Sequence, residues 1–470
     1  MDNFDIVYQI VDHLCDLHDT KKYHVRVPRI AEYASVSRVF QRAVESLTFK
    51  SIIYRDSAED QARFTAAFRP PNAHRRALVR KIFVRLKPPC SGLTPKEVSR
   101  NTKHLTASVS SLFQLLHEWE EGISDRSLNK IYVHIACYIP EPHARDRRPA
   151  LNHDDLFRLP AVRQITELRT NACGLETPHA ATLFQLAAHT PNLEVLDVGY
   201  RDGDHQDASH FRLKQHLALA TAILNLRGKL PNLRELKLHQ EGNRMPWNHS
   251  FQCLDYEEKG IDRVCEALRL LVEGSTLKKL LLDQVRLSPD LFCDRRAQAK
   301  EGDSVTDKGT LWPSLEILDI TTYPVAANGK WYSTGNPRDH EPRWPSIEAS
   351  SDDSDGSGTD HDDPPSLRRG VANHMWPQHF WRRRLDPETW YPVLLAMMSA
   401  RMPALRVGDL FMDFDASGYY YSGFTFGDRD AKDQVPRKWK AKLANKSPWT
   451  PPKGLQMEVD VDALVPPVDD

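Results

Sequence analysis

The sequence lacks the features that mark membrane, secreted and strongly charged proteins. No stretch approaches the roughly 18 consecutive apolar residues of a membrane-spanning helix. The acidic N-terminus lacks the apolar run of a signal peptide. The 470 residues include 63 basic and 64 acidic side chains, giving a formal net charge of −1. Because binding to nucleic acid or to an anionic membrane needs an excess of basic charge, we predict neither as a partner.

Cysteine is scarce and shows no pairing pattern. The chain has seven cysteines, an odd number, and no two of them have the C-x-x-C spacing. A framework of disulfides or a zinc site would need regular pairs. We therefore predict reduced thiols and a location in the cytoplasm, the nucleus or both.

Motifs of the common catalytic sites are also missing. The sequence contains no G-x-S-x-G elbow, phosphate-binding loop, dinucleotide fingerprint or H-E-x-x-H motif. The loop at 202–210 gathers aspartates and histidines, but it lacks the spacing of a calcium loop, so we interpret it as a solvated loop. We predict no catalytic residue, no cofactor and no metal. A catalytic Cys–His pair is the one arrangement that the sequence does not exclude, since nothing singles out one pair among seven cysteines and 20 histidines.

What the sequence does contain begins with two short amphipathic helices. Ile6, Ile10 and Leu14 recur every four residues, which predicts a helix with one apolar stripe. A second helix is predicted over 34–45, with Val36 and Phe40 on its apolar side. Helices this short cannot bury all their apolar surface against each other. We therefore expect part of that surface to contact the rest of the chain or another protein.

This opening segment resembles the F-box that precedes leucine-rich repeats in many fungal proteins. The resemblance covers about the first fifty residues and is carried by residues 5–14, DIVYQIVDHL, and 36–40, VSRVF. The usual Leu-Pro-x-Glu start is replaced by residues 2–5, DNFD, and Phe40 stands where tryptophan is common. The resemblance implies docking to Skp1, the adaptor of cullin ubiquitin ligases, through Ile6, Ile10, Leu14, Val36 and Phe40. A simple helical cap on the following domain is the alternative.

A repeat with an L-x-x-L-x-L core follows in the second half of the chain. Its first leucines lie at 193, 233, 277 and 315, so the steps are 40, 44 and 38 residues, and a weaker copy begins at Leu405. Helical patterns lie between these predicted strands, and helix and strand patterns already alternate from residue 57. Such alternation predicts parallel strands in stacked units. The predicted fold class is α/β: an N-terminal helical F-box-like region, then an irregular leucine-rich-repeat-like solenoid with a parallel sheet.

An acidic segment rich in serine and proline interrupts the last repeat. We predict that residues 324–375 are disordered, because this composition offers little apolar surface to offset ordering. Leu315 and Leu405 lie 90 residues apart, and removing these 52 residues leaves 38, the length of the preceding step. The segment is therefore predicted to be an insertion within one repeat. The predicted divisions are 1–56, 57–323, 324–375, 376–463, with a closing hairpin and C-terminal strands, and a loose tail at 464–470.

These patterns lead to a functional hypothesis, an adaptor that recruits a protein substrate to a Skp1–cullin ligase. Strand side chains that alternate with the buried leucines face away from the core and are available for the target. The predicted target-binding residues are Asp197, Glu235, Lys237, His239, Lys279, Asp283, Asp319 and Asp409. A repeat scaffold without ligase coupling and an unrecognised enzyme are the alternatives.

Overall fold

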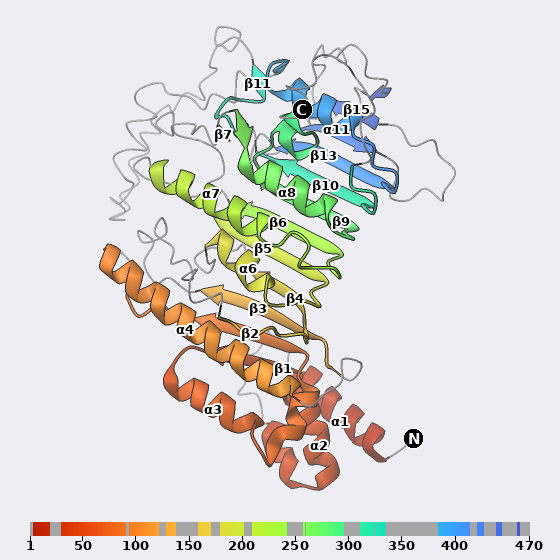
Figure 1. The fold of residues 1–470 in the computed structure, drawn as a ribbon. Helices are drawn as coiled ribbons and strands as arrows, with labels where there is room; N and C mark the ends of the chain where they lie inside the picture. The colour runs from red at the N-terminus through yellow and green to blue at the C-terminus, as the bar shows by residue number, and fades with distance from the viewer. Residues whose placement is uncertain are drawn as a thin grey trace, which may run out of the picture. The chain divides into compact units, whose positions relative to one another are not determined.

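The protein is an α/β protein whose strands are mostly parallel, and Figure 1 shows its fold as a computed structural model. It divides into two compact units, Met1–Tyr200 with Lys229–Leu233, and Arg201–Gly228 with Arg234–Asp470. The structure describes residues 3–18, 30–90, 94–121, 128–137, 158–170, 179–201, 209–241, 257–258, 260–295, 311–323, 325–334, 384–413, 421–426, 439–443 and 458–460.

The first unit begins with helices and continues as alternating helices and strands. Its elements are α1 (Asn3–His18), the 3₁₀ helix η1 (Ile30–Ser35), α2 (Arg38–Thr48), β1 (Ser51–Arg55), α3 (Ala58–Phe68), the 3₁₀ helix η2 (Asn72–Leu78), β2 (Lys81–Leu86), α4 (Pro95–Glu120), β3 (Ile131–Cys137), β4 (Ile165–Thr170), α6 (Ala180–Ala187) and β5 (Val195–Arg201).

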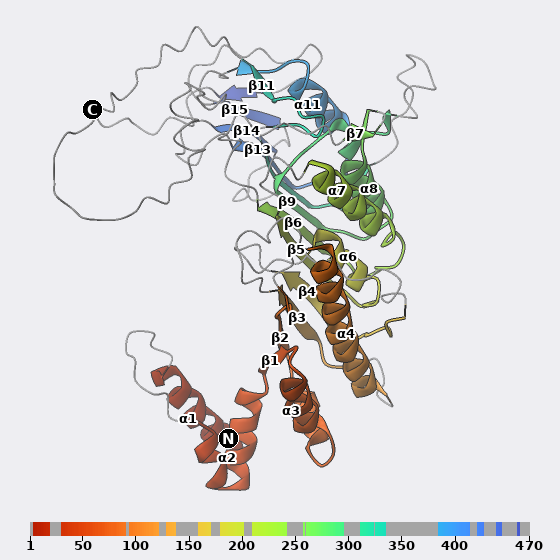
Figure 2. The same ribbon diagram turned by 90° about the vertical axis from the view of Figure 1, so that its left-hand side faces the viewer.

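Strands β1 to β5 pair in chain order, and each pair described is parallel. Figure 2 shows α3, α4 and α6 on one face of this sheet. Trp119 of α4 is buried there against Phe68 of α3, with ring centroids 4.7 Å apart. The opposite face of β2–β4 has no described helix against it. Among the described residues, helices therefore cover one face of this sheet and none covers the other, which is called the open face below.

The second unit repeats this alternation and ends in antiparallel strands. Its elements are α7 (Ser209–Leu224), β6 (Glu235–Glu241), β7 (Glu257–Glu258), β8 (Ile261–Asp262), α8 (Arg263–Glu273), β9 (Lys279–Val285), the 3₁₀ helix η7 (Pro289–Leu291), β10 (Ile317–Thr322), β11 (Ser333–Thr334), β12 (Arg384–Leu385), α11 (Trp390–Ser399), β13 (Val407–Asp413), β14 (Tyr421–Phe426), β15 (Trp439–Leu443) and β16 (Glu458–Asp460).

The order of strands in the second unit agrees with an insertion between β10 and β13. β6, β9, β10 and β13 are parallel neighbours in that order, so β13 adds directly to β10 despite the long intervening segment. β14 pairs antiparallel with β13 and with β15, and β16 adds to β15 in parallel. Most of the predicted disordered segment, residues 335–375, lies outside the described residues.

The first residues of the predicted disordered segment belong instead to the folded unit. Tyr332 is fully buried, and its hydroxyl donates a 2.5 Å hydrogen bond to the carbonyl of Leu287. Val325 and Trp331 pair as a β-bridge and are also buried. The prediction was wrong for residues 325–334, because average composition hid the few aromatic and aliphatic side chains that anchor this stretch.

In four of the five repeats a proline stands two residues before the first leucine, and this Pro-x-Leu pattern has a direct structural explanation. In the repeat that begins at Leu193, the leucine N–H donates to the carbonyl of Thr190 at 3.0 Å, which closes a tight turn. Pro191 occupies the second position of this turn, where its fixed φ angle is favourable. Equivalent turns precede Leu233, Leu315 and Leu405, at 3.3, 3.2 and 3.1 Å. The turn therefore precedes β5, β6, β10 and β13, whereas the Leu277 N–H before β9 donates to the Ser275 hydroxyl at 3.3 Å.

Element boundaries differ from the sequence-based expectations in two helices and two strands. The apolar spacing predicts a helix over 102–121, but α4 begins at Pro95, because Thr94 and Glu97 form a capping box. The second helix begins at Arg38, after the Ser37 cap, and η1 precedes it. The strand patterns of β1 and β15 were too short to be recognised.

We expect the buried leucines to dominate the stability of the second unit. Leu282 of β9 is 1% exposed, and Leu282→Ala should lower the free energy of unfolding by about 2–5 kcal/mol. Leu281→Ala, at the neighbouring half-exposed position, should cost about 1 kcal/mol or less. Urea denaturation followed by circular dichroism measures both. Equal losses for the two variants would contradict the assignment of faces.

Candidate functional site

The N-terminal helices expose an apolar patch on the first unit. Ile6 and Ile10 lie one turn apart on α1, and each is 46% exposed. Val36, in the turn before α2, is 63% exposed. Val11 points the other way and is fully buried against Ala43 of α2. The helix pair thus has an internal apolar seam and a second apolar surface that faces solvent.

Three of the five residues predicted for docking, Ile6, Ile10 and Val36, are exposed. Phe40 is only partly exposed, because it packs against the internal seam of the helix pair. Leu14 lies in α1, but its side chain is outside the described part of the structure.

A buried carboxylate fixes α2 to the rest of the first unit. Glu45 of α2, 6% exposed, contacts Arg75 at 2.7 Å and His74 at 2.9 Å, both from η2. Arg75 also lies over the ring of Phe49, 4.7 Å from its centroid. Burial alone would raise the pKa of Glu45, but hydrogen bonds from His74, Arg75 and Gln41 outweigh burial and lower it. The position of α2 therefore depends on an ionised Glu45.

The residues predicted for target binding lie on strands, and most of them are partly exposed. Glu235, Lys237 and His239 alternate with buried leucines along β6, as the L-x-x-L-x-L pattern predicts. Lys279 and Asp283 of β9, Asp319 of β10 and, in the first unit, Asp197 of β5 are likewise partly or fully exposed. Asp409 differs, because it is only 8% exposed.

Several of these strand residues pair with one another in the second unit. Glu235 contacts Lys237 at 3.1 Å and Lys279 at 3.6 Å, and His239 contacts Asp283 at 2.5 Å. The loop at 202–208, considered above for metal binding, lies outside the described residues.

The open face of the first unit carries a group of side chains that the sequence analysis missed. Phe83 of β2 meets His134 of β3 edge to face, with centroids 5.6 Å apart. Tyr132 of β3 lies 5.9 Å from the ammonium of Lys81 and 5.4 Å from the guanidinium of Arg169. We call Ile53, Lys81, Phe83, Arg85, Tyr132 and His134 the basic aromatic face. The alternating sequences KIFVR at 81–85 and YVH at 132–134 were its signal.

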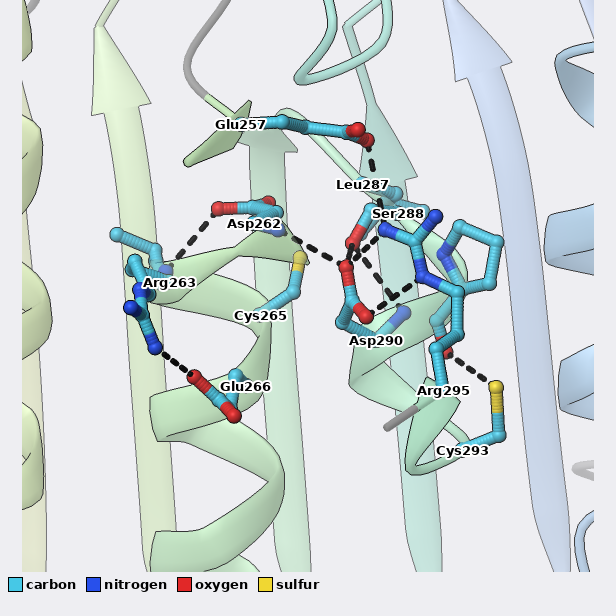
Figure 3. Close-up of polar contacts among 12 residues, drawn as sticks. Glu257, Asp262, Arg263, Cys265, Glu266, Leu287, Ser288, Asp290, Cys293 and Arg295 are labelled. Atoms are coloured by element: carbon cyan, nitrogen blue, oxygen red, sulfur yellow. Dashed lines mark hydrogen bonds and ion pairs between the residues drawn. The ribbon is translucent and has the colours of Figure 1, made fainter. Parts of the chain in front are cut away.

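A buried polar cluster links α8 to the loop after β9 in the second unit (Figure 3). Asp262 accepts a hydrogen bond from the Val264 N–H at 3.0 Å and so caps α8. Asp290 accepts the Asp262 N–H at 2.9 Å and pairs with Arg295, whose pKa this carboxylate raises. These contacts satisfy helix-end and loop groups that would otherwise be costly to bury.

Cys265 lies in this cluster beside Asp262 but is not an activated nucleophile. Burial raises the pKa of the Cys265 thiol well above its usual range, and the adjacent Asp262 carboxylate raises it further. The same carboxylate contacts His216 at 2.8 Å. The thiol therefore stays protonated, and the cluster serves to hold α8 in place.

No protein-family model matches this chain, and no curated protein matches its sequence. Within the described ranges, no group of three or more potential ligand side chains has the geometry to hold a metal ion. No helix in the same part of the chain is both long and apolar enough to cross a bilayer.

We expect the first unit to lose stability in acid as Glu45 becomes protonated. Its pKa lies below the ordinary 4.5 in the folded state, so its contribution is complete above pH 4.5 and disappears as the pH falls below that value. Glu45→Gln should lose about 1–3 kcal/mol at pH 7 and show a flatter acid dependence in urea denaturation. Glu59→Gln removes an exposed ion pair to Arg63 and should match the wild type. The same acid dependence in the Glu45→Gln protein would contradict this role.

Proposed function

We propose that this protein is an adaptor that recruits a protein substrate to a Skp1–cullin type ubiquitin ligase. The observation that carries the proposal is the apolar patch of Ile6, Ile10 and Val36, exposed on a helix pair that already has its own apolar seam. Exposed aliphatic side chains such as Ile6 and Ile10, one turn apart on α1, are typical of a surface that another protein covers. The F-box resemblance of residues 5–14 and 36–40 names that partner as a Skp1-like protein.

The architecture that follows the helices supports the second half of the proposal. The repeats bury their leucines and present alternate polar side chains on strands, as an irregular leucine-rich-repeat-like solenoid does. Parallel strands with one open face offer a large, rigid surface for a protein target. Polar side chains on β6 and β9, among them Lys237 and Lys279, are accessible for such contacts.

The mechanism requires no bond-making group on this chain. An adaptor binds the ligase through one surface and the target through another, and the tether raises the concentration of the target near the ligase. Rigid attachment of the docking helices matters, because a mobile tether spreads the target over a larger volume. The Glu45 contacts to His74 and Arg75 provide such an attachment for α2.

We expect Ile10→Asp to abolish binding to Skp1. The substitution puts a charge next to Ile6 on the exposed apolar side of α1, where burial under a partner would strip it of water. The affinity of the purified full chain for purified Skp1 should fall at least tenfold, measured by isothermal titration calorimetry. Leu217→Asp on α7, at 43% exposure compared with 46% for Ile10, should leave the affinity unchanged.

The same titration separates ligase coupling from a scaffold role. If the wild-type chain does not bind Skp1, or if Ile10→Asp binds as well as the wild type, the adaptor proposal fails. The strand surface would then belong to a protein-interaction scaffold without ligase coupling.

A further inference from the structure

We propose that the basic aromatic face of the first unit binds an extended acidic segment of a partner protein, with an apolar side chain between two carboxylates. The inference deepens the proposed function, because it gives the chemistry of the recruited target. Its starting point is a set of side chains on β1, β2 and β3 that share one open surface. Ile53 there is 45% exposed, and Phe83, Tyr132 and His134 are partly exposed.

The strand register puts these side chains in adjacent rows. Ile53 of β1 is opposite Phe83 of β2, which is opposite His134 of β3. In the next row Lys81 is opposite Tyr132. Parallel neighbours in register lie about 4.8 Å apart, so the rows form one continuous apolar strip bordered by basic groups.

The basic groups of β2 form no ion pair within the part of the chain that the structure describes. Among the described residues, neither Lys81 nor Arg85 has a carboxylate within 4.0 Å. The two acids on the adjoining strands are held elsewhere, since Glu167 and Asp197 contact Arg169 at 3.1 and 3.7 Å. The surface around β2 therefore has an excess of positive charge that complements an acidic partner.

On the exposed strand face of the second unit, acidic side chains outnumber basic ones. Lys237 and Lys279 both contact Glu235 there, and Asp283 and Asp319 add further negative charge. An acidic segment thus has a reason to bind β1–β3 and to avoid β6–β10. This contrast assigns the segment to the first unit.

The spacing of the side chains along β2 predicts the residue pattern of the bound acidic segment. Lys81, Phe83 and Arg85 point to the same side of one strand, and the two basic residues are separated by about 13 Å at the usual rise per residue. An extended peptide repeats its side chains with the same period. Two carboxylates four residues apart would reach Lys81 and Arg85, and the side chain midway would pack on Phe83. The expected pattern is acid-x-apolar-x-acid.

The rings do not suit single-stranded nucleic acid. Binding of that kind uses aromatic faces on which bases stack. Tyr132 already holds both Lys81 and Arg169 against its ring, and Phe83 meets its neighbours edge to face. The observations therefore favour a polypeptide.

The test measures binding of labelled peptides to the full-length protein by fluorescence anisotropy. The probe is a fluorescein-labelled peptide with two copies of Glu-Ser-Leu-Ser-Glu, and the comparison peptide replaces each leucine by serine. We expect saturable binding of the first peptide and at least fivefold weaker binding of the second. The charge-reversed protein, Lys81→Glu with Arg85→Glu, should bind the first peptide at least tenfold more weakly.

A matched variant controls for overall charge. Lys96→Glu with Lys103→Glu makes the same change in net charge at two exposed positions of α4 and should bind the peptide as the wild type does. Equal binding of the peptide to all three proteins, or no binding to any, would overturn the proposal. Tighter binding of a twelve-nucleotide oligouridine that is lost in the Lys81/Arg85 variant would also overturn it.

Titration of Skp1 against the same proteins separates this inference from the proposed function. The Lys81/Arg85 variant should bind Skp1 normally, because its substitutions are outside the apolar patch. Peptide binding without Skp1 binding would leave this surface intact and remove the ligase role. Skp1 binding without peptide binding would support the ligase role and overturn the proposed peptide-binding surface.

Discussion

The structure depends on one repeated main-chain hydrogen bond that fixes each repeat against the one before it. In the second unit, the residue after the first leucine donates to its equivalent in the preceding repeat: Lys278 to Arg234, Glu316 to Lys278 and Arg406 to Glu316, each at 2.8 Å. Because side chains alternate along a strand, fixing this register also fixes which residues are buried. The leucines then fill the core, and the residues between them face outward.

This constraint separates structural polar groups from available ones. On the covered side, polar residues are consumed by capping and loop contacts, as the Asp262, Asp290 and Arg295 cluster illustrates. On the open side, the ion pairs are exposed to solvent, and residues of one charge sign outnumber those of the other. The balance of those charges differs between the two units, and this difference gives the basic aromatic face its selectivity. We therefore place the candidate binding surfaces on the open strand faces, where Lys81 and Arg85 have no carboxylate within 4.0 Å among the described residues.

The N-terminal helices have a small apolar core and are held partly by charged hydrogen bonds. Their seam around Val11 is too small to bury every apolar residue, so Ile6, Ile10 and Val36 remain outside. Glu45 compensates for the small seam by attaching α2 to η2 through charged hydrogen bonds. The same short segment therefore supplies both the exposed docking residues and the residue, Glu45, that attaches α2 to the rest of the unit.

The sequence by itself determined the α/β class, the parallel repeats and the interrupted last repeat, because leucine spacing and Pro-x-Leu turns are local signals that burial enforces. It also marked the apolar residues of α1. Only the tertiary structure decided that Phe40 turns inward, that Asp409 is buried, and that Tyr332 anchors the start of the acidic segment. It alone revealed the basic aromatic face, because Lys81, Tyr132 and Arg169 are far apart in sequence and meet only through strand register.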